Sequence, residues 1–95
     1  MSTVNISYKP AQTEEYVWNW IDENLEKMVA RKVPAENIRL FVDKSRQLVD
    51  FKGKTVKGLM TFKEGVIDIN IEIPLLYRMF GGVIRSSILD ILESM

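Results

Sequence analysis

Isoleucine alternates with polar residues through the segment Ile67-Asp68-Ile69-Asn70-Ile71-Glu72-Ile73. Successive side chains of a β-strand point to opposite faces of its sheet, so this spacing places the isoleucines on one face and the polar residues on the other. One face must then be covered by the rest of the chain, while the other faces water. Such strands are typical of antiparallel sheets that are covered on one side.

Other segments predict the partners of this strand. Val4, Ile6 and Tyr8 alternate with polar residues near the N-terminus, and further strands are expected at about 38–42, 48–51 and 56–62. Short turns at 43–46, 52–54 and 63–65 separate the last four strands. Because connections this short join only antiparallel neighbours, these four strands are expected to form a meander.

Two segments have the apolar spacing of a helix. From Thr13 to Lys32, Val17, Ile21, Leu25 and Val29 fall on one side of the helix, and Thr13 is suited to cap its N-terminus. A second helix is expected from Pro74 to the C-terminus, with Gly81-Gly82 in its interior. Its apolar side would contain Leu76, Phe80, Val83, Ile84, Ile88 and Ile91.

The predicted order is therefore β-α-β-β-β-β-α, an α+β fold in which two helices pack on one face of an antiparallel meander. With 95 residues, we expect a single domain spanning residues 1–95. No apolar run approaches the roughly 18 residues of a membrane span, and no signal-peptide pattern is present, so a cytoplasmic protein is expected.

Composition excludes several kinds of chemistry. The chain has no cysteine and no histidine, which removes disulfides, thiol nucleophiles, Cys/His zinc sites and histidine-based triads. Asp68, Asn70 and Glu72 share one strand face and could in principle bind a hard cation or transfer protons. The wet face of a sheet explains these three residues more simply. We therefore expect no enzyme activity, no catalytic residue, no cofactor and no metal.

Basic residues concentrate in one part of a chain whose net charge is zero. Between Lys44 and Lys63, six basic residues accompany a single acid, Asp50. The predicted turns place Lys44 and Arg46 at one end of the meander and Lys52 and Lys54 at the other. This separation argues against a nucleic-acid site, although a weak site for an anionic partner stays open.

The chain also has more apolar groups than a thin core needs. The expected interface or ligand surface consists of Tyr16, Trp20, Val49, Phe51, Leu59, Leu75 and Leu89. Grouped together, such residues would form a protein interface or a groove for a lipid-like ligand. We expect a two-fold homodimer formed through the helix rims or through an open sheet face bearing Val49, Phe51 and Leu59. The substitution Leu89→Glu would then weaken the dimer and leave the fold intact.

The second half of the chain resembles the polyhydroxyalkanoic acid system proteins, also called the polyhydroxyalkanoate granule region family. The resemblance rests on Asp43 to Met95, a region that contains DKSRQLVDFKG, VKGLMTFKEGVIDINIEI and PLLYRMFGGVIRSSILDIL. The chain lacks the histidine that the family tends to carry in its first strand. It has Phe41 and Asp43-Lys44 where the family tends to have an aromatic residue and a Gly-Asp turn. The arginine-rich final helix of the family is reduced here to Arg78 and Arg85.

This resemblance implies an association with storage-granule gene neighbourhoods and a non-enzymatic role, and it brings no catalytic residues. The sequence thus favours a small non-catalytic binding or assembly protein that is associated with polyhydroxyalkanoate granules or a similar lipid-like surface. A carrier of a small hydrophobic ligand, or a weak module for anionic partners including nucleic acid, is the alternative.

Overall fold

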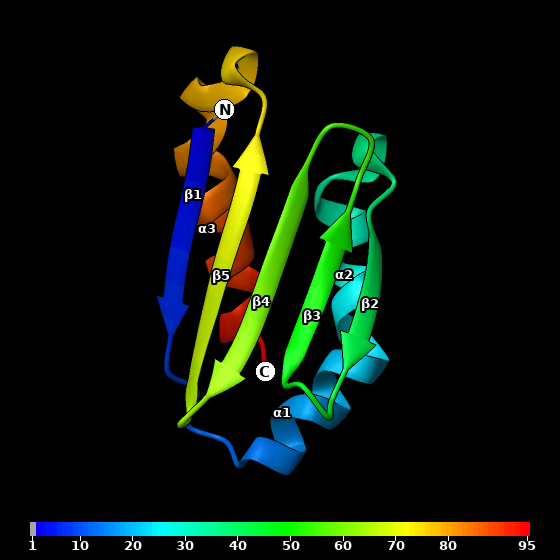
Figure 1. Ribbon diagram of the computed structural model, residues 1–95, viewed down its shortest axis with the longest axis vertical. Coiled ribbons are helices and arrows are strands. Elements are labelled where there is room, and N and C mark those ends of the chain that lie inside the picture. Colours follow the sequence, from blue (N-terminus) through cyan, green and yellow to red (C-terminus); the bar gives the residue numbers. More distant parts are fainter. Residues whose placement is uncertain (1) are drawn as a thin grey trace.

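A five-stranded antiparallel sheet forms one layer of the protein, with strand order β1-β5-β4-β3-β2 (Figure 1). The computed structural model describes residues 2–95, without the side chains of Ser2 and Arg78. The strands are β1 (Ser2–Tyr8), β2 (Arg39–Asp43), β3 (Leu48–Lys52), β4 (Lys57–Lys63) and β5 (Val66–Ile73). The helical elements are α1 (Glu14–Trp20), η1 (Ile21–Leu25), α2 (Glu26–Lys32), η2 (Pro34–Glu36), η3 (Leu75–Phe80) and α3 (Gly81–Glu93). The predicted α+β fold and its element order are confirmed.

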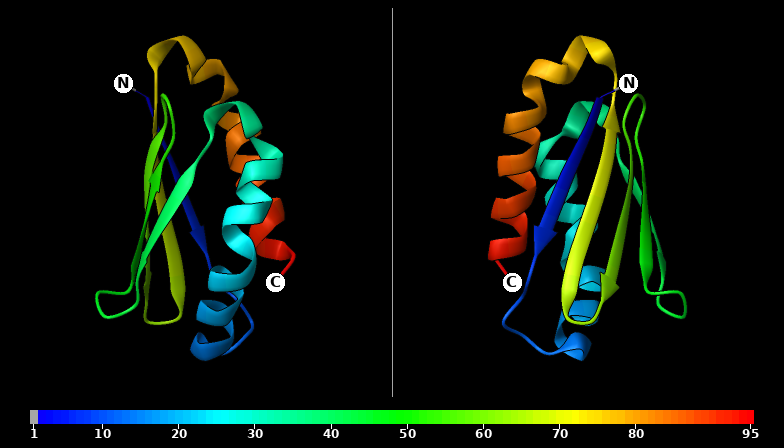
Figure 2. Two further views of the ribbon diagram at one scale, coloured as in Figure 1. Left: turned by 90° about the vertical axis from the view of Figure 1, so that its right-hand side faces the viewer. Right: turned by 60° about the vertical axis from the view of Figure 1, so that its left-hand side comes forward.

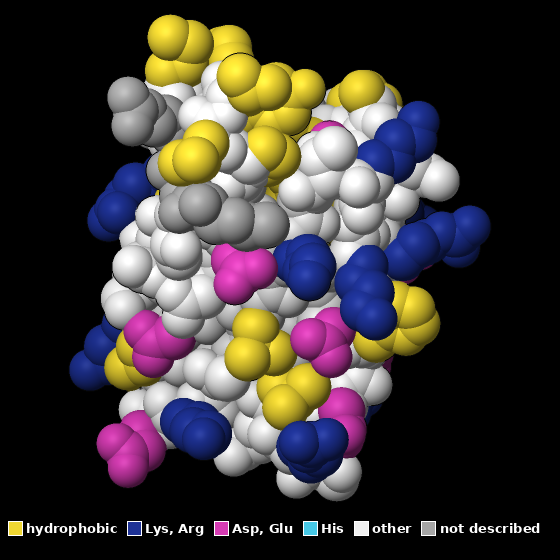
Figure 3. Space-filling model, turned by 45° about the horizontal axis from the view of Figure 1, so that its top comes forward, with side chains coloured by type: hydrophobic (Ala, Val, Ile, Leu, Met, Phe, Trp, Pro, Cys, Tyr) yellow, Lys and Arg dark blue, Asp and Glu magenta, His cyan; other side chains and the backbone are white. Residues whose placement is uncertain are grey.

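Strands β2 to β5 form the predicted meander, and β1 completes the sheet beside β5. Every isoleucine from Ile67 to Ile73 is buried, whereas Asp68, Asn70 and Glu72 are exposed. All helices lie on one side of the sheet (Figure 2). Charged side chains of both signs are spread over the opposite face, which we call the open face (Figure 3).

The predicted first helix runs without interruption through α1, η1 and α2, with a π-helical turn at η1. The Thr13 hydroxyl accepts a hydrogen bond of 3.2 Å from the Tyr16 N–H, which confirms the predicted N-cap. Buried apolar residues occur every four positions from Val17 to Val29, a spacing that drifts by about 40° per step in a regular α-helix. The wider π turn offsets this drift and keeps the stripe on the sheet.

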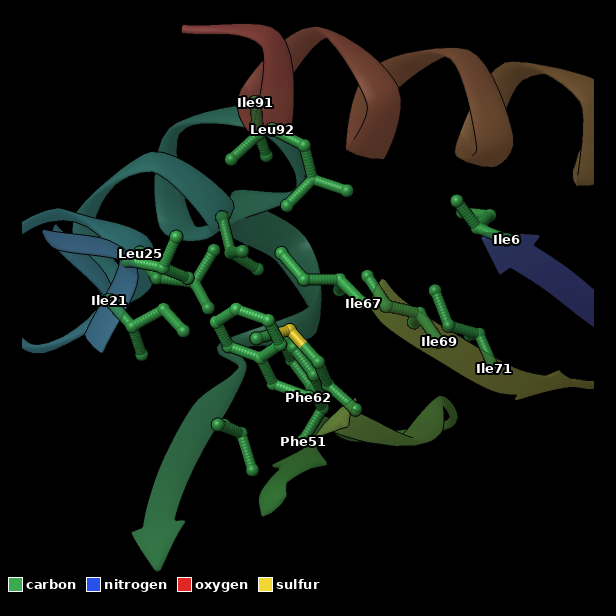
Figure 4. Close-up of a cluster of buried hydrophobic side chains, with 14 of the residues drawn as sticks. Ile6, Ile21, Leu25, Phe51, Phe62, Ile67, Ile69, Ile71, Ile91 and Leu92 are labelled. Atoms are coloured by element: carbon green, nitrogen blue, oxygen red, sulfur yellow. The ribbon is translucent and has the colours of Figure 1, made fainter. Parts of the chain in front are cut away.

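The core fills the space between the helices and the sheet (Figure 4). The rings of Trp18 and Phe62 lie 6.0 Å apart, and Val17, Val49 and Ile67 are completely inaccessible to solvent. Ile91 and Leu92 of α3 close the core at the C-terminal end of the chain. One hydrophobic cluster therefore joins both helices to the sheet.

Each outer strand of the sheet has one backbone group covered by a helix side chain. The Glu26 carboxylate of α2 accepts a hydrogen bond of 3.0 Å from the Leu40 N–H of β2. On the other edge, the Arg85 guanidinium of α3 donates a hydrogen bond of 2.8 Å to the Asn5 carbonyl of β1. A charged side chain over an outer strand hinders pairing with a strand of another molecule. Association through the sheet edges is therefore disfavoured.

The β4–β5 hairpin turns through Glu64 and Gly65, which both have positive φ, at 54° and 76°. A two-residue loop of this kind is a type I′ turn, for which Asn-Gly is the preferred sequence. Glutamate is less suited to left-handed backbone than asparagine. We expect Glu64→Asn to raise the free energy of unfolding by about 0.5–1 kcal/mol, measured by urea denaturation. A loss of stability would contradict the type I′ assignment.

Candidate functional site

Large apolar side chains are exposed together where β5 leads into α3. Their exposed fractions are highest for Leu76, at 86%, and for Met79, at 78%. We call this group the apolar tip, and it consists of Leu75, Leu76, Tyr77, Met79, Phe80 and Val83. Hydrophobic side chains gather at this end of the molecule in Figure 3. The tip lies at one end of the long axis of the protein, which measures 38 Å (Figure 1).

The tip is exposed because this segment runs beyond the end of the sheet. Strand β5 ends at Ile73, and the 3₁₀-helix η3 begins after Pro74, whose carbonyl accepts a hydrogen bond of 2.9 Å from the Tyr77 N–H. With three residues per turn, a 3₁₀-helix distributes its side chains all around its axis. The Tyr77 and Phe80 rings contact each other, with centroids 6.3 Å apart. Most of the other apolar groups here are left facing solvent.

This arrangement corrects the predicted start of the last helix. The α-helix begins at Gly81 rather than at Pro74, so the two glycines lie at its first turn and not in its interior. An added Cβ at Gly81 would make only an ordinary 3.5 Å contact with Val4, and one at Gly82 would meet open space. The predicted core residues Leu76, Phe80 and Val83 are consequently exposed.

The residues predicted to form an interface do not come together. Tyr16 is exposed on α1, Leu59 is exposed on the open face, and Leu75 belongs to the apolar tip. Trp20, at the rim of the predicted helix arc, is buried. Figure 1 places α1 and η3 at opposite ends of the molecule. These three exposed residues therefore do not form one continuous surface.

Val49 and Phe51 lie on the covered face of the sheet rather than on the open face. They pair with Met60 and Gly58, respectively, and both are buried. Leu59 pairs with Asp50 and Asn70, so it shares the opposite face with polar groups. Cross-strand partners point to the same face, which fixes these assignments. The predicted open-face group of Val49, Phe51 and Leu59 is wrong in its first two members.

Leu89 is half-buried and packs against the core cluster. Helix α3 contacts both β1 and α2, and contacts on two sides cover a wider arc of the helix than the sequence pattern indicates. The premise of the Leu89→Glu prediction, that Leu89 lies off the core side of the helix, is therefore wrong. A charge at this position is instead expected to destabilise the fold.

The open face carries the carboxylates that the sequence singled out. Register places Asp68 beside Thr61 and Ser7, and the Ser7 hydroxyl donates a hydrogen bond to the Asp68 carboxylate. Glu72 lies next to Lys57 in the register. Within the described part of the chain, no group of three carboxylate, histidine or cysteine side chains could hold a metal ion.

An apolar cavity of about 50 Å³ lies between α2, α3 and the sheet, lined in part by Val29, Phe51, Ile71, Ile84 and Ile88. An engineered cavity that holds benzene has a volume of about 150 Å³. The cavity is therefore too small for a lipid-like ligand in this conformation. It gives little support to a carrier of a small hydrophobic ligand, whereas the exposed apolar tip supports attachment to a surface.

Basic residues lie at both ends of the meander, as predicted. Lys44 and Arg46 follow β2, and Lys44 forms a 2.6 Å ion pair with Asp22. At the other end, Lys52 and Lys57 are cross-strand partners in β3 and β4, and Lys52 is also paired with Arg39. We call the exposed residues Arg39, Lys52, Lys54 and Lys57 the basic end.

Glu36 fixes the β3–β4 loop, which carries Lys54 of the basic end. Its carboxylate accepts hydrogen bonds from the Thr55 N–H at 2.9 Å, the Thr55 hydroxyl at 2.7 Å and the Val56 N–H at 3.1 Å. The Lys54 N–H also donates to the Glu36 carbonyl, at 3.0 Å. An added Cβ at Gly53 would lie 2.8 Å from the carboxylate, which would have to shift to make room. This role of Glu36 was not predicted from the sequence.

Partial burial acts to raise the pKa of Glu36, but the hydrogen bonds from Thr55 and Val56, with the Lys54 ammonium, hold the pKa below its ordinary value. A lowered pKa stabilises the fold above the unfolded-state pKa, and this contribution is lost as pH falls through the folded-state pKa. We expect Glu36→Gln to be less stable than the wild type near neutral pH and to lose less stability on acidification to about pH 3. Urea midpoints at both pH values test this, and equal acid losses in the two proteins would contradict it.

The fold and the tip define a small α+β protein with an exposed apolar end. A family model for polyhydroxyalkanoic acid system proteins matches residues 7–95. The chain belongs to this family, as its sequence resemblance indicated. No curated protein and no solved structure matches it. Among residues 2–95, no helix is both long and apolar enough to cross a bilayer.

Proposed function

We propose that this protein is a small non-catalytic binding and assembly protein of the polyhydroxyalkanoate system that attaches to the storage granule through its apolar tip. The observation that carries the proposal is the exposure of six large apolar side chains within residues 75–83. Polyhydroxyalkanoates are aliphatic polyesters, so a granule offers an extended apolar surface. Membership of the family supports the choice of this surface over other apolar partners.

The size of the tip is sufficient for such attachment. Burying one large apolar side chain fully contributes about 1.5–3 kcal/mol. Leu76 and Met79 are nearly fully exposed, and together they would contribute about 3–6 kcal/mol. The four less exposed members of the tip add to this sum and offset the loss of rotational and translational freedom on binding.

A non-catalytic role is supported by the lack of cysteine and histidine and by the setting of the open-face carboxylates. Asp68 and Glu72 face solvent beside hydroxyl and ammonium groups, where they are suited to solvating the sheet. Catalytic carboxyls usually lie in a cleft, whereas these two lie on the exposed open face.

Away from a granule, the tip would expose apolar area that a second copy of the chain could cover. We therefore retain the two-fold homodimer as a proposal and place its contact at the tip, including Leu75, rather than at Leu89. The charged side chains of Glu26 and Arg85 over the edge strands support a contact elsewhere. Sedimentation velocity would detect such a dimer.

Fractionation of cells that make polyhydroxyalkanoate tests the proposed function. The wild-type protein is expected in the granule fraction, and the double variant Leu76→Glu with Met79→Glu in the supernatant. The matched control is Tyr16→Glu with Leu59→Glu, which removes two exposed apolar side chains elsewhere and adds the same charge. Wild-type protein that remains wholly in the supernatant would overturn the proposal.

A further inference from the structure

We infer that the apolar tip inserts into a surface coated with anionic phospholipid, whose head groups the basic end contacts. This inference rests on the proposed attachment through the tip and adds the chemistry of the surface to be recognised. The tip alone would fit any apolar surface. The basic residues beside the tip favour an anionic surface over an uncharged one.

The tip and the basic end lie at the same end of the protein. Lys57 is the cross-strand partner of Glu72, which lies three residues before Leu75. From Lys57 the row continues across the sheet through Lys52 to Arg39. Lys54 lies in the β3–β4 loop, and Figure 1 shows this loop and η3 at the same end of the long axis.

Basic residues outnumber acidic residues at this end of the protein. Glu72 lies in the cross-strand row that contains Arg39, Lys52 and Lys57, and Asp50 lies two residues before Lys52 on the same face of the sheet. The Glu36 carboxylate, which accepts hydrogen bonds from the Thr55 and Val56 N–H groups, is also negatively charged, so three acids accompany four basic residues at this end. Those bonds also hold the loop that presents Lys54. The basic end is therefore a fixed feature of the fold.

The opposite end of the sheet has no such excess. Lys44 is paired with Asp22, and Arg46 and Lys63 lie near Asp43, Glu64 and Asp68 in sequence or register. Charge is thus distributed unevenly along the long axis even though the net charge is zero. The excess of positive charge coincides with the apolar end.

An apolar tip beside exposed cations matches a phospholipid surface. Side chains that enter the boundary between head groups and acyl chains are buried by about 5–10 Å, while lysines stay at the level of the head groups. A bare polyester would leave the cations without partners, and a nucleic acid would leave Leu76 and Met79 exposed. Each lysine or arginine near an anionic membrane strengthens binding about fivefold.

Vesicle co-sedimentation tests the inference, with phosphatidylcholine vesicles that contain or lack phosphatidylglycerol. Wild-type protein is expected to bind the anionic vesicles at least about tenfold more tightly, with loss of this preference at high salt. The triple variant Lys52→Glu, Lys54→Glu and Lys57→Glu should weaken binding to anionic vesicles about a hundredfold. The control, Lys44→Glu with Arg46→Glu and Lys63→Glu, makes the same charge change at the far end and should have less than about a threefold effect.

Equal binding of the wild type to both kinds of vesicle, or equal effects of the two triple variants, would overturn the inference. So would the absence of binding to either vesicle. Binding to bare polyester particles distinguishes the proposed granule attachment from the preference for anionic lipid. If the wild type binds such particles and the tip variant does not, the proposed function stands even when the lipid preference fails. Circular dichroism on each variant confirms that the fold is retained.

Discussion

Replacing Phe62 by alanine is expected to lower the free energy of unfolding by about 3–5 kcal/mol. Phe62 is 2% exposed and packs against Trp18, with ring centroids 6.0 Å apart. Its removal would leave a cavity between β4 and the first helix that the surrounding side chains could fill only in part. Because small domains are stabilised by about 5–15 kcal/mol in total, this one substitution would remove a large part of the stability.

Phe41 provides the matched control, since it is also a phenylalanine in a β-strand but is 57% exposed. Its ring lies under the Lys52 ammonium at 5.8 Å, a contact worth about 0.5–1 kcal/mol at an exposed site. We therefore expect Phe41→Ala to cost less than about 1 kcal/mol. Chemical denaturation of both variants compares the free energy of unfolding lost on the covered face with that lost on the open face. A larger loss for Phe41→Ala would contradict the assignment of the open face.

The double variant Leu76→Glu with Met79→Glu is expected to weaken attachment to polyester particles about a hundredfold, which corresponds to about 2.7 kcal/mol. Both side chains face solvent in the free protein, so the change should alter the free energy of unfolding by no more than about 0.5 kcal/mol. Attachment depends on transferring these side chains out of water, and a carboxylate resists that transfer.

Binding isotherms on polyester particles measure this effect, with the Tyr16→Glu and Leu59→Glu variant as the control. The control should bind within about threefold of the wild type because its changes lie away from the tip. Equal loss of attachment in both double variants would mean that binding follows overall apolar surface and not the tip.

Strict alternation made β5 and its two faces predictable from the sequence. Every isoleucine from Ile67 to Ile73 is buried because a slip of one residue would expose all of them. Strand β3 is less well determined, since apolar side chains occur at both Leu48 and Val49. Only its pairing with β4 settles which face Phe51 occupies, and that register is a tertiary property.

The apolar tip was missed for a different reason. Leu76, Phe80 and Val83 fall on the same helical arc as Ile84 and Ile88 if one α-helix begins at Pro74. Helical periodicity does not reveal where the sheet ends or that a 3₁₀ turn comes first. The Gly81-Gly82 pair was the local signal for the change in helix type. The burial of Trp20 was missed similarly, because the π turn at η1 leaves no clear pattern in the sequence.

The tip is the part of this protein that we propose enters the apolar surface. The chain has no cysteine, so a single introduced cysteine can carry an environment-sensitive dye at one chosen position. Leu76→Cys at the tip and Leu59→Cys on the open face are the two positions to label, because both side chains are exposed. On addition of polyester particles, we predict a blue shift of the dye at position 76 and no shift at position 59. A shift at position 59 without one at position 76 would contradict the account.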